Sequence, residues 1–326
     1  MTSAKHEPGG AHETDGATLP VERVAAEIKG LVERRLAELL ASGPDQGRLG
    51  PAMRYSALAA AKRVRAIILV LSAGQGDARR GGALASAAAI EMVHAASLIL
   101  DDLPSMDDAT LRRGRKATHL AFGEDIAILS AVGLITRAFE VVAGDPLLPA
   151  PLRVRVAAIL AEALGPAGLV RGQELDLTRV APPAGVEEIE SMHALKTGAL
   201  FAAATEIGAN LAGLDPGATA SLRDVGRDIG IAFQAYDDLL DAVASTAAVG
   251  KNVRRDSTKA TVVASLGIAE AERRAHARIE SVRRRLAALG PAGHALAGYL
   301  DVLVRTLAQP LTSGGEPLRP VRPRPV

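Results

Sequence analysis

The sequence predicts an all-α fold in which long helices form a single large bundle. Alanine and leucine, both strong helix formers, dominate the 326 residues. Three tyrosines and four phenylalanines are the only aromatic residues, and no notable segment alternates apolar and polar side chains with a period of two. β-Sandwiches and barrels draw on aromatic and β-branched residues, so both are disfavoured. We expect one helical domain over residues 21–308.

Apolar residues recur at helical spacing along this domain, and glycine or proline stands at the borders of several segments. Residues 1–20 are rich in glycine, threonine and charge, which predicts a disordered N-terminal segment. Residues 309–326 are rich in proline, which predicts a disordered tail. A turn is expected at 43–48 and a polar loop at 247–258. The expected helices are 21–41, 62–71, 82–100, 126–143, 152–177, 186–214, 218–244 and, as a charged surface helix, 268–289.

Bulk composition excludes several classes of function. The net charge is +1, so general attraction to nucleic acid is not indicated, and the few aromatic residues offer no base-stacking surface. Cysteine is absent, which excludes disulfides and zinc–thiolate sites and fits a reducing compartment. The first residues lack the apolar segment of a signal peptide, and charged residues interrupt the apolar runs. We expect a cytoplasmic protein without a membrane span.

Two aspartate clusters lie far apart in the chain, and each follows a strongly apolar run. The first reads DDLPSMDD from Asp101, and the second reads DDLLD from Asp237. Pro104 interrupts a regular helix in the first cluster, which favours a bulge that turns its last aspartates back toward its first. Carboxylates at the edge of an apolar interior are costly unless cations compensate them, and Mg²⁺ takes a few carboxylates together with substrate phosphates. The pair predicts a metal-held diphosphate, although the second cluster alone fits a solvated acidic patch equally well.

Basic side chains accompany both clusters. Singly, each lysine is best explained as a solvated surface charge. Together they match two diphosphate groups, since arginine offers forked donors and lysine a point charge. His94 lies about two turns before Asp101 on the same apolar helix, where a lone histidine is more often a satisfied core residue. The basic candidates are Lys62, Arg63, Arg65, Arg112, Arg113, Lys196, Lys251 and Lys259.

The segment 91–125 resembles the first aspartate-rich region of the trans-isoprenyl diphosphate synthases, and it is most similar to that of the bacterial geranylgeranyl diphosphate synthases of carotenoid pathways. The resemblance covers roughly residues 25–305. It implies long helices around a deep central cavity, a polyprenyl synthase catalytic domain and a homodimer. Further motifs appear in the family's order: KRVR at Lys62, GQELD at Gly172, KTG at Lys196, FQAYDDLLD at Phe233 and GKNVRRDSTKAT at Gly250.

The resemblance also implies roles for the matching residues. Three Mg²⁺ ions per substrate-loaded site would be held by Asp101, Asp102, Asp107 and Asp237, with Asp238 and Asp241 in support. The allylic diphosphate would contact Arg112, Lys196 and Lys251. Isopentenyl diphosphate would be held by Lys62, Arg65, His94 and Arg113, with Phe233 near the isopentenyl group. The developing allylic cation would lie beside Lys196, Thr197 and Gln234.

Some positions depart from the family's pattern. Ala60 and Ala61 stand where the family usually has Gly-Gly or similar before the KRVR lysine, and Ala66 stands where it has proline. Each added methyl group affects a backbone that approaches phosphate, which bears on isopentenyl affinity. Thr258 replaces the usual glycine near Lys259. None of these departures removes a metal ligand.

Product length depends on the depth of the pocket. Ala96 and Ser97 precede Asp101 by about one helical turn, so we expect them to line the pocket beneath the metal site. In relatives that stop at fifteen carbons, a large aromatic side chain at one of these places blocks growth. Both residues are small here, which predicts a chain of at least twenty carbons.

The predicted function is a Mg²⁺-dependent prenyltransferase, a transferase of isoprenoid and carotenoid biosynthesis. It would condense isopentenyl diphosphate with dimethylallyl, geranyl or farnesyl diphosphate to make geranylgeranyl diphosphate. A farnesyl or longer-chain synthase is the alternative within the class. A terpene cyclase is less consistent with the scarcity of aromatic residues, and a non-catalytic synthase subunit is less consistent with two intact aspartate motifs.

Overall fold

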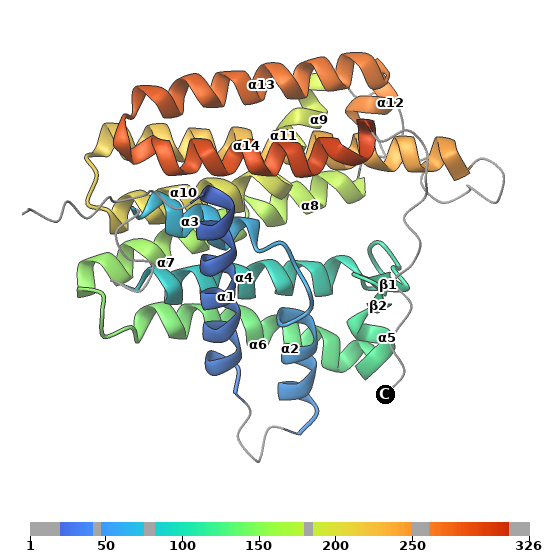
Figure 1. Cartoon of the computed structure of the whole chain (residues 1–326). Coiled ribbons are helices and arrows are strands. Elements are labelled where there is room, and N and C mark those ends of the chain that lie inside the picture. The colour runs from blue at the N-terminus through green and yellow to red at the C-terminus, as the bar shows by residue number, and fades with distance from the viewer. Residues whose placement is uncertain (1–19, 42–46, 75–81, 179–184, 249–260, 313–326) are drawn as a thin grey trace, which may run out of the picture.

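The computed structural model describes residues 20–41, 47–74, 82–178, 185–248 and 261–312. Within these ranges the fold is all-α, as predicted, apart from one pair of two-residue antiparallel strands. The long helices stack in layers that run nearly parallel to one another (Figure 1). The termini of the chain and most of the predicted turn at 43–48 lie outside the described residues.

The first half of the bundle contains the central helix of the fold. α4 (Ala83–Asp101) packs against α3 (Val64–Ser72) on one side and α6 (Glu124–Ala143) on another, while α1 (Val21–Leu39) and α2 (Leu49–Ala57) cross these helices (Figure 1). After α4 come β1 (Leu111–Arg112), β2 (Arg115–Lys116), α5 (Thr118–Phe122) and, beyond α6, α7 (Ala150–Leu164).

The second half supplies the opposite layers. α10 (Ala199–Leu211) packs along α11 (Pro216–Ala248), and α11 is covered in turn by α13 (Ile268–Ala288) and α14 (Pro291–Thr312) (Figure 1). The remaining elements are α8 (Leu169–Thr178), α9 (Val186–His193), the π-helical segment η1 (Ala194–Gly198) and α12 (Val262–Leu266).

Small side chains allow the helices to approach one another closely. The buried face of α4 includes six alanines between residues 85 and 96, and α10 buries four more. Gly208 of α10 lies so close to α3 that an added Cβ would be 2.5 Å from the Leu69 carbonyl oxygen. Alanine and glycine thus give this core its close packing where larger residues would separate the layers.

Several predicted boundaries change in the structure. The expected helix 152–177 is divided into α7 and α8, because the extended Gly165 precedes Pro166, and proline disfavours helical geometry in the residue before it. The expected helix 186–214 is continuous but contains η1. α2 and α14 had no predicted counterpart. α14 runs to Thr312, so the first residues of the predicted tail are helical, and the rest lie outside the described ranges.

Two described helices, α4 and α6, are long and apolar enough to cross a bilayer by length and composition alone. Glu91 interrupts the apolar run of α4 and Arg137 that of α6, and the absence of a membrane span stays a prediction. Most of α4 is buried in the core, which is typical of the central helix of a globular domain. Only a third of α6 is buried, so its outer side remains an apolar surface.

Candidate active site

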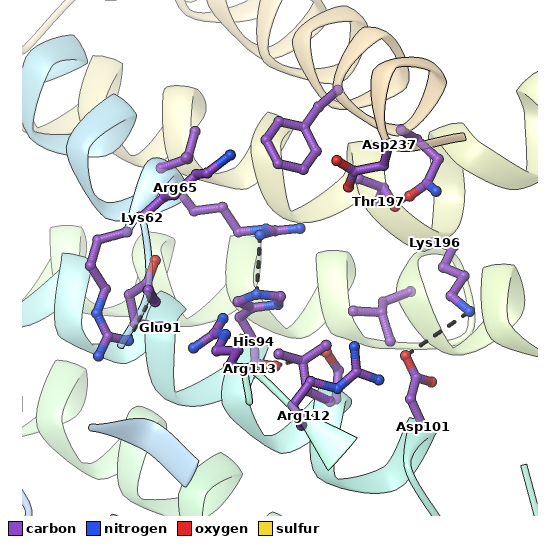
Figure 2. A pocket seen from close by; sticks show the side chains of 18 of the residues that line it. Lys62, Arg65, Glu91, His94, Asp101, Arg112, Arg113, Lys196, Thr197 and Asp237 are labelled. Atoms are coloured by element: carbon purple, nitrogen blue, oxygen red, sulfur yellow. Dashed lines mark hydrogen bonds and ion pairs between the residues drawn. The ribbon is translucent and has the colours of Figure 1, made fainter. Parts of the chain in front are cut away.

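A polar cavity of about 750 Å³ opens between the helical layers. Its walls come from the end of α4, the loop before α3, α8, η1 and the middle of α11. Figure 2 shows side chains of α4 and α11 facing each other across it, with cationic side chains between them. The cavity therefore brings together motifs that are far apart in the sequence.

The first acidic wall is made where α4 ends. The chain folds back on itself after Asp101, and the Asp107 N–H donates a hydrogen bond of 2.9 Å to the Asp101 carbonyl. This bulge, predicted from Pro104, brings both carboxylates to the cavity. Burial raises the pKa of Asp101, and the nearby Lys196 ammonium opposes part of that shift.

Asp102 turns away from this wall. It is 2% exposed, it is not among the residues that line the cavity, and it accepts a hydrogen bond of 2.9 Å from Arg112 Nε. Since Arg112 itself lines the cavity, Asp102 holds a cation in place there. The structure thus does not bring Asp102 together with the other predicted metal ligands of its motif.

The second acidic wall belongs to α11. Asp237 and Asp241, one turn apart, line the cavity opposite α4. Burial raises the pKa of Asp237 to about 6, with Lys62 opposing the shift. Asp238 lies one step round the helix, buried and outside the cavity lining. Like Asp102, it is not brought to the cavity.

No group of three or more histidine, aspartate or glutamate side chains forms a preformed metal cage within the described ranges. The donors instead stand as separate carboxylates on two walls. This arrangement fits Mg²⁺, which commonly takes one or two carboxylates, retains waters and is completed by substrate phosphates. It does not fit a metal that needs a complete protein cage. Asp101, Asp107, Asp237 and Asp241 are the side chains placed to contribute.

A basic cluster occupies the end of the cavity near α3. Lys62, Arg65, His94 and Arg113 all line it. A guanidinium only donates, so Arg65 donates to His94 Nε2 across 3.3 Å, and the imidazole accepts in its neutral form. Burial and the charge of Arg65 lower the pKa of His94 well below its ordinary value, which is consistent with this state.

Arg63, one of the basic candidates for the diphosphates, instead pairs with Glu91, which was not assigned a role, and the two buried residues hold this cluster in place. Arg63 and Glu91 form an ion pair of 3.1 Å with both side chains 2% exposed, and Arg63 also donates to the Ala57 and Ala59 carbonyls. Arg63 adopts a left-handed conformation with φ of 55°. Its neighbours Lys62 and Arg65 consequently face the cavity. The sequence did contain a signal, since Glu91 is the one acidic residue in the apolar stretch 83–100.

Lys196 is presented by η1. Its Nζ donates to Asp176 Oδ2 at 2.6 Å and lies 4.0 Å from Asp101 Oδ2 (Figure 2). π-Helical segments are uncommon and often occur at functional sites. Glycine makes this one possible, because a Cβ on Gly172 would lie 2.2 Å from the Lys196 nitrogen, and a Cβ on Gly230 would lie 2.7 Å from the Gly198 Cα. The GQELD motif thus contributes Gly172, which allows η1 to approach α8 closely, and Asp176, whose carboxylate accepts from Lys196.

The remaining predicted residues have mixed positions. Thr197, Gln234, Phe233 and Ser97 line the cavity, and Ala60 and Ala61 do so beside the basic cluster. Ala96 is fully buried in the core and does not line the cavity. Lys251, Lys259 and Thr258 lie outside the described residues.

These features define a class: an all-α protein with a polar cavity whose walls carry opposed carboxylates and two groups of cations. The sequence model of the family described as polyprenyl synthetase matches residues 46–287. The chain belongs to the polyprenyl synthetase family, whose members are prenyltransferases, and the resemblance seen in the sequence is thereby confirmed.

The relatives of this chain include both geranylgeranyl and farnesyl diphosphate synthases. A geranylgeranyl diphosphate synthase of Pantoea ananas is 39% identical over 85% of this chain and 91% of its own. A farnesyl diphosphate synthase of Geobacillus stearothermophilus is 37% identical over 88% and 98%. Among solved structures, an FPP/GFPP synthase of Zymomonas mobilis matches with a TM-score of 0.78 and 32% identity, covering 87% of this chain and 98% of that one.

Proposed function

We propose that this protein makes geranylgeranyl diphosphate by joining isopentenyl diphosphate to an allylic diphosphate. The observation that carries the proposal is the division of cations in one cavity. Lys62, Arg65 and Arg113 gather at the α3 end, while Arg112 and Lys196 lie beside the aspartates. Two separate basic groups match two diphosphates, which is what a condensation of two such substrates requires.

The allylic substrate is bound with its diphosphate between the two acidic walls. Asp101, Asp107, Asp237 and Asp241 would hold Mg²⁺ there, and the bound metal would neutralise the diphosphate and make it a better leaving group. The side chains of Arg112 and Lys196 donate to the same group as the allylic C–O bond breaks and its electron pair departs. The opposed carboxylates therefore serve binding rather than proton transfer.

The isopentenyl substrate is held by the basic cluster so that its double bond lies near the allylic carbon. Its electron pair forms the new C–C bond, and a proton is then lost to the released diphosphate, which restores a double bond. Holding the two reacting carbons in contact removes several kcal/mol from the barrier. Thr197 and Gln234 line the cavity, and we assign their oxygens to the stabilisation of the developing positive charge.

A twenty-carbon product is supported by the small side chains beneath the first acidic wall. Ser97 lines the cavity, and its hydroxyl donates back to the His94 carbonyl at 2.9 Å rather than projecting into the space. The named relatives include both farnesyl and geranylgeranyl synthases, so product length is the part of the proposal that needs measurement.

Product analysis tests the proposal directly. Purified protein is incubated with isopentenyl diphosphate, dimethylallyl diphosphate and Mg²⁺, and the dephosphorylated products are separated, with EDTA as the control. A dominant twenty-carbon product that disappears with EDTA is expected. A fifteen-carbon product would retain the reaction and overturn the pocket assignment, whereas no elongation with any allylic primer would overturn the function.

A second experiment addresses the pocket alone. Ser97→Phe places an aromatic ring in the cavity and is expected to shift the product to fifteen carbons. Ala96→Tyr is less direct, because overpacking at a fully buried position costs about 1–3 kcal/mol of stability. An unchanged product from Ser97→Phe would exclude this part of α4 as the limit on chain length.

We also propose that the protein is a homodimer formed through α6. Ile128, Leu129 and Val132 are 44–53% exposed on this helix, and Leu120 on the neighbouring α5 is 50% exposed. A two-fold interface uses the same patch on both copies, so one apolar helix face is sufficient to make it. Light scattering after gel filtration is expected to give twice the chain mass. Leu129→Glu with Val132→Glu is expected to give the monomer, whereas Leu177→Glu on α8 leaves the mass unchanged.

A further inference from the structure

A chain of polar side chains extends from the cavity into the layer between η1 and α11. The Thr197 hydroxyl donates to Gln234 Oε1 at 3.0 Å, and Gln234 Nε2 donates to Asp238 Oδ1 at 3.1 Å. His193 Nε2 lies 3.8 Å from the other carboxylate oxygen of Asp238. Thr197 and Gln234 line the cavity, whereas Asp238 and His193 are buried and do not.

Asp238 fixes which end of the Gln234 amide faces Thr197. The NH₂ end of the amide faces Asp238, and a carboxyl oxygen accepts from Gln234 Nε2. The amide oxygen is then directed toward the Thr197 hydroxyl, which donates to it. With the amide turned over, its oxygen would face the Asp238 oxygen that accepts from the NH₂ group in the present arrangement. The direction of a neutral dipole at the cavity wall thus depends on the carboxyl group behind it.

His193 stands on the far side of the same carboxylate. It is the last residue of α9, directly before the π-helical turn that carries Lys196 and Thr197. Buried carboxylates are costly without a positive or donating partner, and Asp238 also lies near the charges of Asp237, Asp241 and Asp176. The imidazole Nε2, at 3.8 Å, is near the limit of ion-pairing distance and beyond hydrogen-bond distance, and it is the side chain placed to pair with this carboxyl group when protonated.

We propose that Asp238 and His193 are positioning residues for the prenyl transfer, which hold the Gln234 oxygen toward the carbon where positive charge develops. The inference rests on the proposed function, in which Thr197 and Gln234 face the allylic cation. Neither Asp238 nor His193 touches a substrate. Asp238 acts through Gln234, and His193 acts through Asp238. This gives the second aspartate of DDLLD a task other than binding metal.

The decisive test is a double-mutant cycle on the wild-type background. The variants are Asp238→Asn, Gln234→Leu and the combination of the two, with kcat, both KM values and the Mg²⁺ concentration for half-maximal rate measured for each. The asparagine that replaces Asp238 can present either end of its amide, so the Gln234 direction is no longer fixed. We expect kcat to fall about tenfold, with KM values and Mg²⁺ dependence within about twofold of wild type. The double variant should be no slower than Gln234→Leu alone.

The His193 step is tested by a matched pair. His193→Gln keeps a donor at nearly the position of Nε2, whereas His193→Leu removes it at similar volume. We expect kcat to fall in the leucine variant and to recover largely in the glutamine variant, again with little change in KM. Thermal unfolding followed by circular dichroism verifies that each variant is folded, and the histidine pair decides the matter if Asp238→Asn does not fold.

Three results would overturn the inference while wild-type protein still makes product. A higher Mg²⁺ requirement in Asp238→Asn would identify Asp238 as a metal ligand. Losses that multiply in the double variant would show that Asp238 and Gln234 act independently. Equal rates for the two His193 variants would show that His193 does not act through Asp238. If the wild-type protein forms no prenyl product, the proposed function fails, and this inference fails with it.

Discussion

The two aspartate motifs have similar sequences but different local structures and different partners. DDLPSMDD is a loop closed by its own backbone hydrogen bonds, whereas DDLLD lies on the continuous helix α11. In each motif the second aspartate turns away from the cavity. Asp102 meets the guanidinium of Arg112, while Asp238 meets the neutral amide of Gln234 and the imidazole of His193. One motif therefore orients a cation, and the other orients a dipole.

This difference teaches that a run of aspartates need not be a set of equivalent ligands. The carboxylates that face the cavity are available to metal and substrate. Those that turn away hold neighbouring side chains, Arg112 in one motif and Gln234 in the other, in a fixed orientation at the same cavity. The following predictions separate these two tasks, and they are arranged from the largest expected effect to the smallest.

The cavity-facing carboxylates should be the most sensitive positions on both walls. Asp101→Asn and Asp237→Asn each remove a charge that faces the bound diphosphate, so we expect turnover to fall by roughly a hundred- to a thousandfold. Steady-state kinetics at saturating Mg²⁺ measures the loss. Asp301→Asn, which removes a surface carboxylate paired with Arg283, is the matched control and should retain full activity. Normal turnover in either cavity variant would show that the two walls do not act together.

Asp102→Asn should affect binding, in contrast to Asp238→Asn. Without its carboxylate partner, Arg112 is no longer held toward the allylic diphosphate. A charge-assisted hydrogen bond of this kind contributes enough for about a tenfold rise in the KM for the allylic substrate, with kcat and the isopentenyl KM little changed. Substrate titrations of both variants provide the comparison. If both variants lowered kcat equally, the distinction between the motifs would be lost.

Period and residue type were sufficient for the helical class and the two acidic walls, whereas the residues of the basic cluster were assigned from the family resemblance. The bulge after Asp101 could also be predicted, since Pro104 cannot continue a helix. The direction of Asp102 and Asp238 could not, because adjacent residues in a run of aspartates have the same chemistry and differ only in their angle around the helix. The role of Arg63 depends on a left-handed backbone that no neighbouring glycine indicates.

The stability of the metal-free protein should depend on pH through α11. Burial raises the pKa of Asp237 to about 6 and that of Asp238 to about 7, from an ordinary value of 3.8. At these two carboxyl groups the folded protein therefore binds more protons than the unfolded chain between about pH 4 and 7, while the lowered pKa of His94 opposes part of this difference. The contribution of the two carboxyl groups to the free energy of unfolding accordingly falls as pH rises through this window, by an amount on the order of several kcal/mol.

Urea unfolding in EDTA at pH 5 and pH 8 measures this difference. Asp238→Asn removes the group with the higher pKa and should reduce the difference between the two pH values. Asp301→Asn should leave it as it is in the wild-type protein. A wild-type protein that is more stable at pH 8 than at pH 5 would contradict the sign of the prediction.

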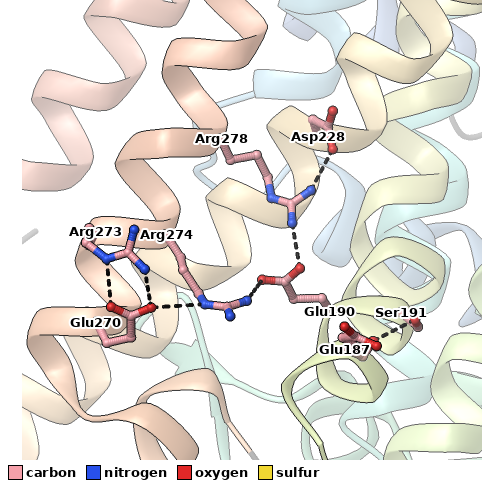
Figure 3. Close-up of polar contacts among 8 residues, drawn as sticks. All are labelled: Glu187, Glu190, Ser191, Asp228, Glu270, Arg273, Arg274 and Arg278. Carbon is pink, nitrogen blue, oxygen red and sulfur yellow. Dashed lines mark hydrogen bonds and ion pairs between the residues drawn. The ribbon is translucent and has the colours of Figure 1, made fainter.

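The smallest expected effect comes from an ion-pair network on the outer side of the second motif (Figure 3). Arg278 of α13 pairs with Glu190 of α9 at 2.6 Å and with Asp228 of α11 at 2.7 Å, and Arg274 adds a contact to Glu190. Glu190→Gln should reduce the free energy of unfolding by about 1 kcal/mol, less at high salt, and leave kcat unchanged. Glu187→Gln on the same helix is the control for urea unfolding. A large loss of kcat would show that this network also affects the positions of the residues in the active site.

The π-helical turn at Ala194–Gly198 makes the register of the chain unusually important at this point. A π turn accommodates one more residue than an α turn, and each residue of an α-helix rotates the following side chains by about 100°. Because the π turn absorbs its extra residue locally, removing a single residue here would convert it to regular helix while α9 and α10 keep nearly the same orientation. His193 and Glu190 would then keep their partners, whereas Lys196 and Thr197 would be presented differently to the cavity. A one-residue deletion should therefore impair turnover far more than it impairs folding.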